Sequence, residues 1–130
     1  MLFTDMHQVI VSLASNCNQK ENLNQARERL GQILSSCRFT KALWTEPYGS
    51  EKGKTAADRL YLNQLAYAET ALPVAELVAM LKAIERDMGR TGEDRSQGIV
   101  RIDLDLLQYD KERFHLRDWN RSYIKALLSL

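Results

Sequence analysis

The stretch Ile99–Tyr109, with the sequence IVRIDLDLLQY, alternates from residue to residue between two sets of side chains. The first set is apolar and contains Val100, Ile102, Leu104 and Leu106. The second set contains Arg101, Asp103, Asp105 and Leu107. Because successive side chains of a strand point to opposite faces, the pattern predicts a β-strand with one face against an apolar core and a second face that carries charge.

Three more strands and two helices are predicted upstream of this stretch. The first of these strands is apolar on both faces, which is typical of the centre of a sheet, and the two helices show apolar residues at helical spacing. The predicted elements are, in order, a strand at Gln8–Ala14, a helix from about Gln19 to Ser35, a strand at Arg38–Glu46, a strand at Leu60–Glu69, a helix from Pro73 to Gly89, the strand Ile99–Tyr109 and a short helix from Arg117.

Polar segments connect these elements. Residues 47–58 and 90–98 form two long ones. Such segments are often binding loops, and a lid is one possibility for residues 47–58. Asn18 and Glu21 have the spacing of a helix cap. For Ser15 and Asn16, capping of the same helix is the expected role and orientation of loops the alternative.

The order β-α-β-β-α-β is that of a ferredoxin-like sandwich, an α+β fold in which an antiparallel sheet carries both helices on one face. The other face of the sheet is expected to be open, and a C-terminal helix follows the last strand. A chain of 130 residues fits a single domain, residues 1–130. Since this fold hosts many functions, the function has to be argued from individual side chains.

The charge balance narrows the classes of partner. Eighteen Lys and Arg residues face 17 Asp and Glu residues, for a net charge of +1, which gives no general attraction for nucleic acid or anionic membranes. The chain carries no run of about 18 apolar residues and does not begin like a signal peptide. We therefore expect a cytoplasmic protein that binds neither nucleic acid nor membranes.

Asp103 and Asp105 are the most informative pair. On one strand face their Cα atoms lie about 7 Å apart, from a rise of about 3.3 Å per residue, and Mg²⁺ favours a few carboxylates together with water and phosphate oxygens. The alternative is an exposed strand face with solvated charges, with Arg101 paired beside Asp103. Basic residues near the pair in sequence favour polyphosphate binding, although each alone could be a surface charge: Arg90, Arg95, Arg101, Arg113, His115, Arg117 and Arg121.

Tyr61 and Asn63 share a face of the third predicted strand. An aromatic plane beside an amide that can donate and accept hydrogen bonds suits a flat heterocycle with amide-like edges. The alternative is cross-strand packing for Tyr61 and a sheet-edge hydrogen bond for Asn63.

Several short motifs occur together in a fixed order. They are Ala14, Ser15 and Asn16 after the first strand, the loop Trp44–Gly49, Tyr61 to Asn63, Ile84 and Glu85 before Gly89 and Arg90, Asp103 to Asp105, His115, and Asn120 to Tyr123. In these motifs and over nearly its whole length, the chain resembles the 6-hydroxymethyl-7,8-dihydropterin pyrophosphokinase family of folate biosynthesis.

The resemblance implies a reaction in which ATP donates pyrophosphate to the pterin hydroxymethyl group and AMP is released. It implies that Asp103 and Asp105 hold two Mg²⁺ ions, and that the partners are a small pterin and ATP, with an oligomer possible. By the same resemblance, Tyr61 and Tyr123 would enclose the pterin ring and Asn63 would read its polar edge. The other implied contacts are Thr45 and Tyr48 with the pterin, and Glu85, Arg90, Arg101, His115 and Arg121 with ATP, Arg90 also serving catalysis.

The chain departs from the family at several positions that bear on ATP, two of them arginines in the family. Val100 stands where family members carry an arginine three residues before the first aspartate, and Gly92 stands where a second arginine follows the Gly-Arg pair. Two functions therefore stay open: an active Mg²⁺-dependent pyrophosphokinase, and a catalytically weakened or inactive homologue that acts as a pterin- or nucleotide-binding module.

Overall fold

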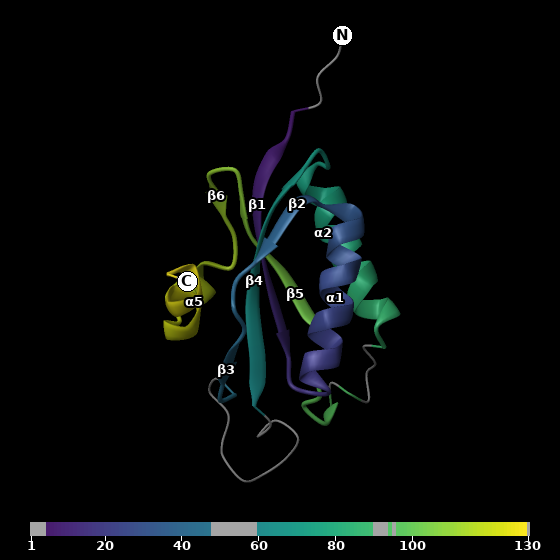
Figure 1. Cartoon of the computed structure of the whole chain (residues 1–130), viewed down its shortest axis with the longest axis vertical. Helices are drawn as coiled ribbons and strands as arrows, with labels where there is room; N and C mark the ends of the chain where they lie inside the picture. Colours follow the sequence, from purple (N-terminus) through teal and green to yellow (C-terminus); the bar gives the residue numbers. More distant parts are fainter. Residues whose placement is uncertain (1–4, 48–59, 90–93, 95, 130) are drawn as a thin grey trace.

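The most apolar strand, β1 (His7–Ser15), lies in the middle of the sheet. It pairs antiparallel with β4 (Tyr61–Thr70) on one side and with β5 (Asp103–Tyr109) on the other. The computed structural model describes residues 5–47, 60–89, 94 and 96–129. Its sheet runs in the order β2-β4-β1-β5-β6, with β3 also paired to β4 (Figure 1).

The remaining elements complete the predicted order. Apart from α1 (Gln19–Ile33) and α2 (Val74–Asp87), they are short: β2 (Ser35–Phe39), β3 (Leu43–Thr45), β6 (Glu112–Arg113), α4 (Leu116–Trp119) and α5 (Ser122–Leu128). The antiparallel sheet with both long helices on one face confirms the ferredoxin-like α+β fold. Gly89, at φ +94, follows α2 in a conformation that favours glycine, as its predicted role at the helix end requires.

The main core lies between the sheet and the two long helices. From α1 it includes Leu23 and Leu30, both 0% exposed, and from α2 it includes Leu77 and Leu81. Full burial of a leucine side chain contributes about 1.5–3 kcal/mol. This face of the sheet is therefore the scaffold of the molecule.

The expectation of an open second face is wrong over part of the sheet. The C-terminal segment folds back over it (Figure 1), and α5 places Ile124 and Leu127 against Leu65 of β4 and Leu107 of β5. These four side chains, each at most 1% exposed, form a second, smaller core. Their sequence neighbours are consequently held near the polar residues of the same face.

Two strands differ from the prediction by more than a residue at an end. The second predicted strand is interrupted into β2 and β3, because at Thr40 the side-chain hydroxyl, at 3.1 Å, accepts the bond from Leu65 N. The last strand begins at Asp103 instead of Ile99, since Val100 N donates to the Asn16 side chain at 2.7 Å. The backbone before Asp103 is thus tied to the end of β1 by a side chain.

The predicted capping of α1 is right in position for Asn18 and wrong in its bonds. Asn18 is the N-cap residue, but it takes a left-handed conformation and makes no side-chain cap bond. Ser15 instead donates to Cys17 O at 2.9 Å, and the buried Asn16 donates to Gly98 O at 2.8 Å. The alternative expectation for these two, orientation of loops, is what the structure shows.

None of the described helices combines the length and hydropathy that crossing a bilayer requires.

Candidate functional site

A cavity of about 340 Å³ opens on the face of the sheet opposite the long helices, beside α5. A volume of this order holds a small organic ligand. It gathers most of the residues predicted to bind a heterocycle, with polar groups and aromatic rings on one wall. The lining residues are Ala14, Thr45, Glu46, Pro47, Tyr61, Asn63, Gly98, Val100, Asp103, Arg121 and Tyr123.

The pairing of β3 with β4 fixes the amide end of this cavity. The register sets Leu43 opposite Asn63 and Thr45 opposite Tyr61. The amide nitrogen of Asn63 donates to Thr45 Oγ1 at 2.8 Å and to Leu43 O at 3.1 Å. Since Asn63 is 3% exposed, its amide is held in one orientation, and among the described residues no donor reaches its Oδ1 atom. The carbonyl oxygen is thus free to accept a hydrogen bond from a ligand.

The short helix α5 supplies Tyr123, and Arg121 directly precedes this helix. Both residues line the cavity, Tyr123 together with Tyr61 of β4. Burial raises the pKa of the Tyr123 phenol above its ordinary value, and a hydrogen bond with Arg121 opposes that shift. At neutral pH the ring is therefore uncharged, as stacking on a neutral heterocycle requires.

Asp103 and Asp105 lie on the same face of β5, as the alternation predicts. In the register with β1, Asp103 lies opposite Ala14 and Asp105 opposite Ser12. Both carboxylates line a small cavity of about 60 Å³ that continues from the larger one. Because Asp103 also lines the larger cavity, the acidic pair begins at its wall and extends away from it.

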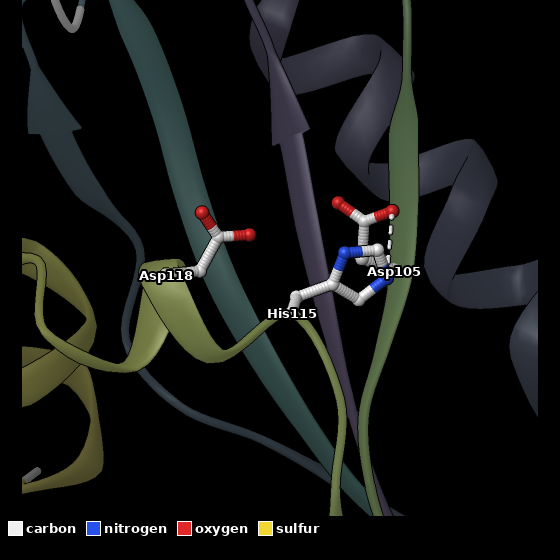
Figure 2. A group of neighbouring side chains, drawn as sticks. All are labelled: Asp105, His115 and Asp118. Carbon is white, nitrogen blue, oxygen red and sulfur yellow. Dashed lines mark ion pairs between the residues drawn. The ribbon is translucent and has the colours of Figure 1, made fainter.

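His115 and Asp118 bring two more polar groups to Asp105 (Figure 2). His115 Nε2 lies 3.7 Å from Asp105 Oδ1, and one ligand atom from each of the three residues falls within 4.8 Å of the others. His115 reaches this place from a left-handed backbone conformation, φ +53, just before α4. Two carboxylates and an imidazole are a donor set that can hold a divalent cation.

Glu85 lines neither of these cavities. It contacts the strand of the acidic pair from the helix-covered face of the sheet. It lies on the sheet-facing side of α2, 2% exposed, and its Oε2 accepts the backbone N–H of Leu104 at 2.7 Å. Leu104 lies between the two aspartates in sequence, so this bond holds the backbone from which both carboxylates project. The predicted contact of Glu85 with ATP stays a prediction.

Arg101 is held by Asp94. Its Nε donates to Asp94 Oδ2 at 2.8 Å and a second nitrogen lies 3.3 Å from Oδ1. The hydrogen bond, followed by the charge of Asp94, raises the pKa of the guanidinium. The guanidinium therefore lies on Asp94, whereas the alternative expectation had set it beside Asp103. Val100 supplies an apolar wall to the cavity.

A third cavity, of about 180 Å³, lies between α2, β5 and the segment after β6. It is mostly apolar, and its polar side chains are those of Lys82, Asp105 and His115. The lining residues are Val78, Leu81, Lys82, Leu104, Asp105, Leu106, Phe114 and His115. Asp105 thus lines both this apolar cavity and the small cavity that it shares with Asp103.

Two residues of the site were missed by sequence reasoning. Lys82 Nζ lies 3.4 Å from Glu85 Oε1 and 3.9 Å from Asp105 Oδ1, and Asp118 pairs with Arg121 at 3.3 Å. Lys82 could have been found from its position one helical turn before Glu85. For Asp118 the only signal was its place three residues after His115.

Several predicted residues lie outside the described part of the chain. They include Arg90 and Tyr48, predicted to contact ATP and the pterin, and nearly all of the predicted lid at residues 47–58. The expected roles of these residues stay predictions.

Comparison with known proteins agrees with the resemblance in the motifs. The sequence model of one family, described as 7,8-dihydro-6-hydroxymethylpterin-pyrophosphokinase, matches residues 10–129. The mitochondrial folate synthesis bifunctional protein of Arabidopsis thaliana is 32% identical over 130 residues, which cover 94% of this chain and 23% of the relative. The corresponding Pisum sativum protein is 31% identical, with 96% of this chain and 25% of the relative covered.

A bacterial relative is closer in length. The 2-amino-4-hydroxy-6-hydroxymethyldihydropteridine pyrophosphokinase of Porphyromonas gingivalis is 29% identical over 139 residues, with 93% of this chain and 88% of the relative covered. The chain thus spans about a quarter of the plant proteins and most of the bacterial one.

Proposed function

The chain belongs to the 7,8-dihydro-6-hydroxymethylpterin-pyrophosphokinase family, and from this premise we propose that it transfers pyrophosphate from ATP to 6-hydroxymethyl-7,8-dihydropterin and releases AMP. The observation that carries the proposal is the position of the acidic pair. Asp103 lines the cavity with the aromatic rings and the amide, and Asp105 lines the apolar cavity on the other side.

Two cavities joined by two carboxylates suit a reaction between two bound molecules. The pterin ring would lie between Tyr61 and Tyr123, with Asn63 accepting from its amide-like edge. The adenine would occupy the apolar cavity, and the phosphates would then pass over Asp103 and Asp105. This arrangement brings the pterin hydroxyl to the phosphates without any covalent intermediate on the protein.

The residues present fit Mg²⁺. Asp103 and Asp105 offer hard oxygen donors from one strand face, and Asp118 is a further carboxylate within reach of Asp105. When bound, Mg²⁺ neutralises charge on the phosphate oxygens and on the leaving AMP. Arg121 and His115 add positive or hydrogen-bonding groups beside the same carboxylates, and Arg90 is proposed to do so from outside the described residues.

In the transfer, the hydroxyl oxygen of the pterin bonds to the β-phosphorus. The bond between that phosphorus and the oxygen bridging to the α-phosphate breaks, AMP leaves with the bridging oxygen, and the hydroxyl proton passes to solvent. The chain contributes alignment of the hydroxyl and preorganised charge, which are the main sources of catalysis in phosphoryl transfer.

The test is AMP release from ATP with the hydroxymethyl-dihydropterin and Mg²⁺. We expect pterin-dependent AMP from the wild-type chain and a loss of at least about 10²-fold in Asp103→Ala and in Asp105→Ala, because preorganised charge at the phosphates is removed. Glu28→Ala, which removes an exposed carboxylate of α1 on the far side of the sheet, should retain full activity. Absence of pterin-dependent AMP from the folded wild-type chain would refute the proposal.

One observation favours a second candidate, a binding module without turnover. Arg101 is engaged by Asp94 and Val100 lines the cavity, so fewer cations face the phosphates than the family pattern supplies. Calorimetric titration distinguishes the two functions. A binding module would take up pterin with no dependence on Mg²⁺ and ATP and would release no AMP.

A further inference from the structure

Lys82 of α2 lies between a buried and a functional carboxylate. Its Nζ is 3.4 Å from Oε1 of Glu85, a side chain that is 3% exposed, and 3.9 Å from Oδ1 of Asp105. The other oxygen of Glu85 is bound to Leu104 N. Because a buried carboxylate is costly without a partner, the contact with Glu85 favours a position of the ammonium that is also near Asp105.

The stem of Lys82 lines the apolar cavity, while its side chain as a whole remains 46% exposed. The ammonium therefore stands at the mouth of the space proposed for adenine, on the side where Asp105 begins the acidic pair. A phosphate chain that leads from this cavity to Asp103 has to pass within its reach.

The other described charges near this point are already shared. His115 lies against Asp105, Arg121 against Asp118, and Arg101 against Asp94. Lys82 cannot coordinate a metal, since an ammonium has three donors and no lone pair. It competes with a cation for Asp105, but it attracts phosphate oxygens.

We propose that Lys82 is a nucleotide-binding residue of this chain, which neutralises Asp105 in the absence of a cation and contacts a phosphate oxygen when the metal nucleotide binds. One N–H keeps its contact with Glu85 while another turns from Asp105 to the phosphate. The inference rests on the proposed function, because it assumes that ATP occupies the apolar cavity and the acidic pair.

The proposal makes two predictions of opposite sign for Lys82→Met. Binding of Mg²⁺ with α,β-methylene ATP, measured by calorimetry, should weaken about tenfold, the loss of one charge-assisted hydrogen bond. Binding of Mn²⁺ alone, measured by electron paramagnetic resonance, should tighten about threefold, because a positive charge near Asp105 is removed. Lys82→Arg keeps the charge and should bind the nucleotide nearly as wild type does.

The control is Lys20→Met, which removes an exposed lysine of α1 and should change neither affinity. A purely structural role for Lys82 would lower both affinities together, and that result, or an unchanged nucleotide affinity in the folded variant, overturns the inference. Failure of the proposed function has a different signature, a wild-type chain that binds the nucleotide and yields no pterin-dependent AMP.

Discussion

The two faces of the sheet are built from the same strands, but one face carries the main core and the other carries the ligand cavity. On the helix-covered face, β4 places Leu62 and Ala66 in the main core. On the opposite face, the same strand places Asn63 in the ligand cavity and Leu65 in the smaller core under α5. Alternate side chains of this one strand thus belong to the main core and to the face that carries the cavity.

The difference between the faces lies in what holds each one. The main core is covered by two long helices, whereas the second is held by the short α5, which also carries Tyr123. Damage to the first face should therefore lower stability alone. Damage to the second should lower stability less and alter ligand binding.

Leu30→Ala tests the scaffold face and has the largest expected effect. Leu30 of α1 is 0% exposed in the main core and distant in sequence from the cavity. Truncation should lower the free energy of unfolding by about 2–5 kcal/mol, measured by urea denaturation. Below the unfolding transition, kcat/KM should stay at the wild-type value. A large loss of activity in the folded variant would contradict the separation of the two faces.

Leu127→Ala tests the opposite face. Leu127 is 0% exposed in the smaller core, but a short terminal helix can settle into the space, so the loss of stability should be about 2 kcal/mol, the low end for such truncations. Because Tyr123 and Arg121 both move with α5, the KM for the pterin and the KM for ATP should both rise. Unchanged pterin binding would show that α5 is held by other contacts.

Much of this arrangement follows from sequence patterns with a local cause. Alternation alone predicts that Asp103 and Asp105 share a face of their strand and that Tyr61 and Asn63 share a face of theirs. The structure confirms both pairs. Helical spacing similarly predicts which sides of α1 and α2 are buried. These features depend on periodicity, which the sequence carries directly.

The remaining features depend on tertiary placement. Asp118 reaches Asp105 only because the chain turns at His115, φ +53, and returns over the sheet. Arg101 pairs with Asp94 and not with Asp103, a choice that depends on how the segment before β5 is tied to Asn16. No residue pattern within a single element specifies such partners.

Asn63→Ala tests the cavity face of β4 at a residue whose neighbour in sequence, Leu62, belongs to the main core. The substitution removes the amide that Thr45 and Leu43 hold in place. Pterin affinity should fall about tenfold through the lost hydrogen bond, measured by calorimetry, with little change for the ATP analogue. The exposed Asn24→Ala of α1 serves as control. Equal losses for both ligands would place the pterin elsewhere.

Asp110→Asn has the smallest expected effect and probes the end of the sheet where β5 turns into β6. The Asp110 carboxylate accepts from His7 Nδ1 at 2.6 Å and from Gln8 N at 2.9 Å. The His7 hydrogen bond, followed by that of Gln8, lowers the pKa of Asp110 from its ordinary value of 3.8.

A pKa that is lower in the folded state stabilises the fold above pH 4 or so, and this stabilisation is lost as the pH falls through the lowered value. Asparagine tolerates the left-handed backbone of position 110, φ +53, so the variant tests the charge alone. The Tm of Asp110→Asn should be slightly below that of wild type at pH 7, and the gap should narrow as the pH falls below the ordinary carboxyl pKa and through the lowered one. Activity should not change, because neither Asp110 nor His7 lines the ligand cavities. A gap in Tm that is constant with pH would mean that the carboxylate charge contributes nothing and that the turn is held by its backbone.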